Sequence, residues 1–128
     1  MHFNIIIMSE YTEEQYEIID QEIDMAIQEI DRIFPDAKFD ICTSFHDKLD
    51  HLLTDKKQIF ISNVKDCYCW DDINTPKQQF FEIKGEKLTY KYVLNELIRL
   101  NFNPECNHTF LESIDKVTDI QYRLWMGS

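Results

Sequence analysis

The spacing of hydrophobic residues between positions 13 and 34 predicts a long amphipathic helix. Apolar side chains recur there every three or four residues, at Tyr16, Ile19, Ile23, Ala26, Ile27, Ile30, Ile33 and Phe34. This period is that of one helical face, which we expect to be buried. Thr12 and Gln15 have the spacing of a capping box at the helix start, and Pro35 ends the helix.

Shorter patterns predict the remaining elements. Runs rich in β-branched and aromatic residues favour strands, and leucines at helical spacing favour two further helices. We expect strands at residues 3–8, 38–43, 58–64 and 80–84, and helices at 46–54 and, after a Thr89 cap, at 90–101. Residues 65–78 show no regular period and are interpreted as a loop.

The C-terminal residues predict a hairpin, with strands over 108–114 and 120–126. The second strand alternates strictly between two faces. Ile120, Tyr122, Leu124 and Met126 share one face, and Gln121, Arg123 and Trp125 share the other. Helices and strands interleave, and the hairpin adds an antiparallel pair. We therefore expect an α+β fold, with a mixed sheet of five to six strands, helices packed on one face and a C-terminal antiparallel hairpin.

The bulk composition predicts one α+β domain over residues 1–128. The chain has 128 residues, of which 44% are hydrophobic, and no linker-like stretch divides it. The net charge of −11 repels nucleic acid and anionic membranes, so we expect no direct binding to either. No apolar run reaches bilayer length and no secretory signal is visible, which predicts a cytoplasmic protein, in the host cytoplasm if it is viral.

Negative charge is concentrated in the long predicted helix. Residues 1–34 contain nine acidic residues and one basic residue, a net of −8. Five carboxylates fall in one narrow sector beside the apolar face: Glu13, Glu17, Asp20, Asp24 and Asp31. Like-charged neighbours four residues apart each destabilise a helix by a few tenths of a kcal/mol, so stability alone would favour lysines in this row.

Three interpretations of the acidic row remain open. It is a solvated face that keeps the protein soluble, a surface that binds a basic partner protein, or a divalent-metal site. A metal site needs converging carboxylates, whereas a helix spreads them along a line. Eight acids between positions 13 and 31 give roughly one charge per 3.4 Å of axis, which matches the phosphate spacing of one nucleic-acid strand.

The cysteine and histidine residues offer an alternative site. Cys67, Cys69, Cys106 and His108 form a Cys-x-Cys and Cys-x-His pair, a composition that zinc accepts. Only one residue separates the members of each pair, whereas structural zinc sites use two to four. The competing interpretation is that these are small buried thiols and a histidine near the end of the sheet. The alternative function is thus a zinc-binding module or enzyme.

The predicted 46–54 helix contains two acid–histidine couples. His46 with Asp50 and Asp47 with His51 are four residues apart, but the histidines themselves diverge. No nucleophile–base arrangement is legible, so we expect no catalytic site and no cofactor.

Trp125 stands on the polar face of the last predicted strand, next to Arg123. An exposed tryptophan beside an arginine is typical of a protein interface, although a covering helix would make it a core residue. An interface between copies at the hairpin is a further alternative.

The leading hypothesis is a small acidic protein-interaction module without enzymatic activity. It would act as an inhibitor, immunity or viral or phage counter-defence protein that binds a basic, nucleic-acid-binding site on a partner. The partner-binding residues would be Glu13, Glu17, Asp20, Asp24, Asp31 and Trp125.

Overall fold

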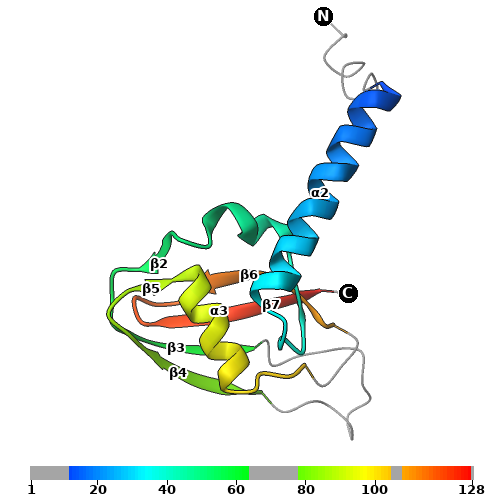
Figure 1. The fold of residues 1–128 in the computed structure, drawn as a ribbon. Coiled ribbons are helices and arrows are strands. Elements are labelled where there is room, and N and C mark those ends of the chain that lie inside the picture. Colours follow the sequence, from blue (N-terminus) through cyan, green and yellow to red (C-terminus); the bar gives the residue numbers. More distant parts are fainter. Residues whose placement is uncertain (1–11, 64–77, 105–107, 128) are drawn as a thin grey trace, which may run out of the picture.

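A long helix rises from an α+β body in the computed structural model, which describes residues 12–63, 78–104 and 108–127 (Figure 1). In chain order the elements are α2 (Glu13–Ile33), β1 (Asp40–Ile41), the 3₁₀ helix η1 (Thr43–Lys48), β2 (Leu52–Thr54), β3 (Gln58–Asn63), β4 (Phe80–Lys84), β5 (Leu88–Thr89), α3 (Tyr90–Arg99), β6 (Phe110–Lys116) and β7 (Gln121–Gly127). The strand expected at residues 3–8 and the loop expected at 65–78 lie outside the described residues, except for Gln78.

Five strands form a mixed sheet in the order β1-β6-β7-β3-β4. The pairs β6/β7 and β3/β4 are antiparallel, and the pairs β1/β6 and β3/β7 are parallel. A second, two-stranded sheet joins β2 to β5. This arrangement confirms the expected α+β class, the mixed sheet and the C-terminal antiparallel hairpin.

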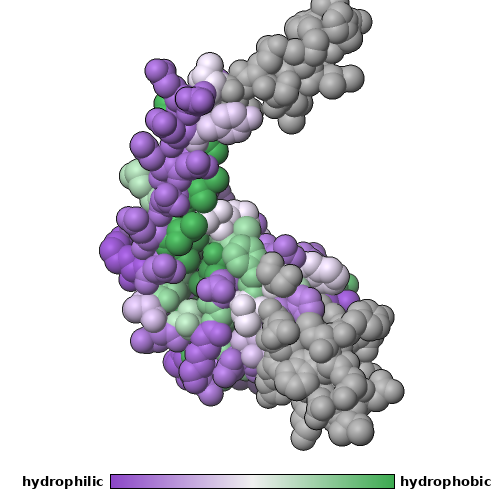
Figure 2. Space-filling view, turned by 90° about the vertical axis from the view of Figure 1, so that its right-hand side faces the viewer, coloured by the Kyte–Doolittle hydropathy of each residue, from purple (hydrophilic) through white to green (hydrophobic). Residues whose placement is uncertain are grey.

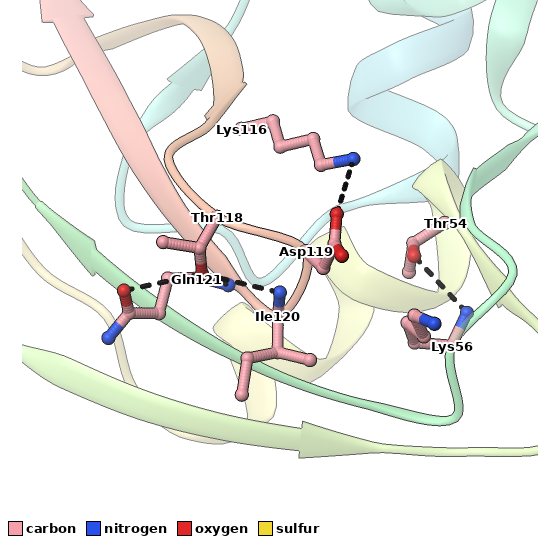
Figure 3. A network of polar contacts seen from close by, with 7 residues as sticks. All are labelled: Thr54, Lys56, Lys116, Thr118, Asp119, Ile120 and Gln121. Atoms are coloured by element: carbon pink, nitrogen blue, oxygen red, sulfur yellow. Dashed lines mark hydrogen bonds and ion pairs between the residues drawn. The ribbon is translucent and has the colours of Figure 1, made fainter.

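The turn between β6 and β7 is closed by side chains (Figure 3). The Thr118 hydroxyl accepts hydrogen bonds from the backbone N–H groups of Ile120, at 3.4 Å, and Gln121, at 3.1 Å. Lys116 forms an ion pair with Asp119 at 3.1 Å across the same turn. Backbone hydrogen bonds from Val117 and Thr118 to the Gln121 carbonyl close the same turn. A threonine hydroxyl that adds to such bonds is a common turn device, and together they fix the register of the two strands.

One face of the main sheet carries the hydrophobic core. α3, η1 and the C-terminal end of α2 contribute to the core on this face, and no polar or charged residue among those described is buried. Phe102, which is 1% exposed, contacts two other rings of the core: its ring centroid lies 5.2 Å from that of Phe39 and 5.8 Å from that of Phe81.

The ends of α3 follow local rules. The Thr89 hydroxyl accepts a hydrogen bond from the Tyr92 N–H, which confirms the predicted N-cap. At the other end Asn101 adopts a left-handed conformation with φ 65°, and the Phe102 N–H donates to the Leu97 carbonyl. This Schellman ending stops the helix at Arg99, two residues before the predicted end.

The helix predicted at residues 46–54 is wrong. The structure has η1 over Thr43–Lys48, followed by β2, which pairs with β5. The backbone N–H groups of Tyr90 and Lys91 donate to the carbonyls of His51 and Leu49, so distant partners hold this segment extended.

The central position of Phe102 makes it a sensitive test of the core. We expect Phe102→Ala to lower the free energy of unfolding by about 3–5 kcal/mol, because it empties a ring-sized space between Phe39 and Phe81. The matched control is Phe80→Ala, which removes a ring that is 73% exposed and should cost under about 1 kcal/mol. Urea unfolding of both variants measures the difference, and equal losses would contradict this description of the core.

Candidate functional site

Among the described residues, the long helix α2 is attached to the body at its C-terminal end (Figure 1). Its N-terminus has the predicted capping box: the Gln15 N–H donates to the Thr12 hydroxyl at 3.1 Å, and the Thr12 N–H donates to the Gln15 side-chain oxygen at 2.8 Å. Ile30 is its one buried residue, and Phe34, directly after the helix, enters the core with it. The outer turns of α2 therefore stand away from the sheet.

The acidic row lies in the open along this helix. All five of its carboxylate residues are exposed, and none forms an ion pair with a residue that the structure describes. They fall within a sector of about 60° on a regular helix, immediately beside the apolar face. The row is Glu13, Glu17, Asp20, Asp24 and Asp31. Among the described residues, then, no ion pair neutralises this row.

The apolar face of α2 is not buried as the sequence pattern had suggested. Tyr16 is 48% exposed, Ile19 36% and Ile23 44%, whereas Ile30 at the base is 3% exposed. Figure 2 shows a line of hydrophobic side chains running down the helix into the body, with hydrophilic side chains along its other edge. The exposure of this row could not be predicted from the sequence, because periodicity shows that a face is apolar and not what covers it.

A groove runs between α2 and η1 where the helix leaves the body. It has a volume of about 650 Å³. Ile19, Ile23, Met25 and Ala26 of α2 form its apolar side, and the acidic residues Glu22, Glu29 and Asp47 are also in its lining. Carboxylates therefore flank the apolar row of α2 on both sides, with Glu22 and Glu29 opposite the acidic row.

Glu29 differs from the other acids of α2 in having a cationic partner. Arg32 donates two hydrogen bonds to it, one of them from Nε to Oε2 at 3.1 Å. These bonds, with the positive charge of Arg32, lower the pKa of the Glu29 carboxyl below its ordinary value. Arg32, the single basic residue in the acidic N-terminal region, is thus already engaged.

The acid–histidine couples considered in the sequence do not form a site. His46 lies in η1, and its Nδ1 is 3.5 Å from Oδ1 of its neighbour Asp47 rather than paired with Asp50. Within the described ranges, no three His, Cys, Asp or Glu side chains are grouped to hold a metal ion. Of the predicted zinc set, Cys67, Cys69 and Cys106 lie outside those ranges, so that assignment stays a prediction.

Trp125 belongs to a different surface. It is 49% exposed on the face of the sheet opposite the core, as the alternation in β7 indicated. Phe60 and Phe80 are exposed on the same face, beside a hollow of about 420 Å³ that Arg123 and Val117 also line. Phe60 was missed although its strand alternates in the same way, with Ile59 and Ile61 buried. The predicted partner-binding set therefore divides between two separate surfaces.

No helix among the described residues is long and apolar enough to cross a membrane. The 21 residues of α2 would have the length, but charged side chains occur throughout it.

The Glu29–Arg32 pair gives a pH-dependent prediction. We expect Arg32→Gln to raise the pKa of Glu29 toward its ordinary value, measured by an NMR titration of the side-chain carboxyl carbon. Because the pKa is lowered in the folded protein, the pair stabilises the fold above the unfolded-state pKa, and this contribution is lost as the pH falls through the lowered value. Arg99→Gln, which removes the partner of Glu96 instead, is the control and should leave Glu29 unchanged.

Comparison with known proteins assigns this chain to no group: no family model, curated protein or solved structure matches it significantly. Its function must therefore be argued from these surfaces, of which the α2 arm, with an apolar row between two acidic edges, is the most distinctive.

Proposed function

We propose that this protein is a small acidic interaction module that uses α2 to bind a basic surface on a partner protein. The observation that carries the proposal is the exposure of the acidic row together with the apolar row beside it. Carboxylates attract and orient a basic partner, and apolar contacts hold it after encounter. A purely solubilising face would need no uncovered isoleucines beside it.

The energetic cost of the row supports a binding role. Asp20 and Asp24, like Glu13 and Glu17, are like-charged pairs four residues apart, each costing a few tenths of a kcal/mol. Glu13 lies in the first turn, where the helix dipole favours negative charge, but Asp20 and Asp24 lie too far along to benefit. A basic partner would turn this internal repulsion into attraction.

The partner's basic surface would be of the kind that otherwise binds nucleic acid. A line of carboxylates on a rigid helix presents negative charge along an axis as a phosphate backbone does. The protein would then act as an inhibitor, immunity or counter-defence protein in the cytoplasm, by occupying that surface. Trp125, on the other face of the sheet, would contribute only to a second contact.

Carbodiimide cross-linking tests the proposal, because this reagent joins carboxylates directly to the lysine amines that touch them. In extracts of the source cell, we expect the α2 carboxylates to become linked to lysines of a partner protein. The triple variant Glu17→Lys, Asp20→Lys, Asp24→Lys should reduce at least tenfold the products formed by the carboxylates of the row that it retains, Glu13 and Asp31, while leaving the fold intact, since all three substituted side chains are exposed. Salt well above physiological strength should also reduce them.

A control variant with the same net charge distinguishes binding through α2 from a general effect of the protein's net charge. Asp36→Lys, Asp55→Lys, Asp115→Lys alters exposed acids outside α2 and, like the α2 variant, changes the net charge from −11 to −5, because each reversal adds two. This control should retain most of the cross-linked product. If the two triple variants behave alike, or if the α2 variant cross-links as well as the unaltered protein, the proposal is wrong.

A further inference from the structure

The apolar row of α2 follows a heptad repeat. Its members are spaced alternately by three and four residues: Tyr16, Ile19, Ile23, Ala26, Ile30 and Ile33. These are the a and d positions of a coiled coil, in which a seam of this spacing packs against the matching seam of a second helix. An amphipathic helix needs only a broad apolar face, so this strict alternation is a more specific feature.

Within the described residues, the fold buries one end of this seam and leaves the other end partly exposed. Ile30 is 3% exposed within the core, and Ile33 packs against it. Tyr16, Ile19 and Ile23 remain between 36% and 48% exposed. The open seam is therefore continuous with the hydrophobic core, and a helix laid along it would extend that core outward.

The flanking positions show which kind of helix fits. On one side of the seam the e positions include Glu13 and Asp20, and on the other side the g positions include Glu22 and Glu29. In a coiled coil these positions face the partner and determine its identity through ion pairs. A partner with lysine or arginine at its own e and g positions would therefore be paired on both sides.

A second copy of this chain fits poorly. Neither e nor g positions between residues 13 and 29 contain a base, so two copies of α2 could form no ion pair across such a seam. Arg32 is held by Glu29 on its own helix. Bringing two arms of this charge together would instead place carboxylates near carboxylates, which is destabilising.

The groove between α2 and η1 would accommodate one end of the partner helix. Three seam residues line the groove, Ile19, Ile23 and Ala26, together with Met25 beside the seam. Ala26 is small enough to allow close approach. From Glu13 to Glu29 the helix rises by about 24 Å, which corresponds to a partner of a little over two heptads.

We infer that the outer part of α2 is one half of a short two-stranded coiled coil, whose other half is a helix with basic residues flanking a heptad seam. This inference rests on the proposed function and deepens it by naming the structural class of the basic partner. The interaction would be both apolar, along the seam, and ionic, along its two acidic edges.

Binding of synthetic peptides to the full chain tests the inference. The probe is a 21-residue peptide of three heptads with Ile at a, Leu at d and Lys at e and g. The first comparison peptide has the same composition in scrambled order, and the second has Glu at e and g. By isothermal titration calorimetry we expect the Lys heptad peptide to bind at least tenfold more tightly than its scrambled form, and the Glu peptide not to bind.

Variants of α2 locate the binding seam. Ile19→Ser with Ile23→Ser removes two exposed seam residues and should weaken binding of the Lys heptad peptide at least tenfold. The control is Ile18→Ser with Val117→Ser, which removes two apolar residues that are 54% and 51% exposed, one on the same helix but off the seam and one outside the helix. The control should change the Kd less than twofold, and circular dichroism should show equal helix content in both variants.

The possible results separate this inference from the proposed function. Equal binding of the heptad and scrambled peptides would overturn the coiled-coil inference but not the proposed function, which the α2 cross-links test independently. The inference would also fall if the protein alone were a dimer by light scattering that Ile19→Ser with Ile23→Ser converted to a monomer, because the occupant would then be a second copy. If the α2 cross-links were absent and neither the Lys heptad peptide nor its scrambled form bound, the inference and the proposed function would both be wrong.

Discussion

The attachment of α2 to the body through its last turn determines which side chains of this helix are exposed to solvent. Ile30 and Phe34 are buried in the core, whereas the turns before them stay exposed, with η1 lining a groove beside part of their length. Had α2 lain flat across the sheet, its isoleucines would be hidden and only its carboxylates would face solvent. Because it is held at its base, the same helix presents apolar and acidic side chains together.

Signals that act over a few residues were readable from the sequence. The capping box at Thr12, the stop before Pro35 and the cap at Thr89 each depend on one side chain and the adjacent backbone. The bounds of β4 and the two faces of β7 were also predicted, because period-two alternation directly reports which side of a strand is buried.

Features that depend on distant partners were not readable. Leucines at positions 49, 52 and 53 suggested a helix, but pairing of β2 with β5 and two backbone hydrogen bonds to the start of α3 hold that segment extended. The same limit applies to the candidate site. Periodicity placed the acidic row correctly beside an apolar face, yet whether that face is covered depends on how far the body extends under the helix.

The separation of arm and body has an evolutionary consequence. The residues that stabilise the body lie in the sheet, in α3 and at the base of α2, whereas the outer turns of α2 contribute nothing to the described core. Substitutions in those turns can therefore accumulate with little effect on folding, as long as they keep a helix. A binding surface of the kind proposed for these turns is free to diverge rapidly as its target changes, while the scaffold stays the same.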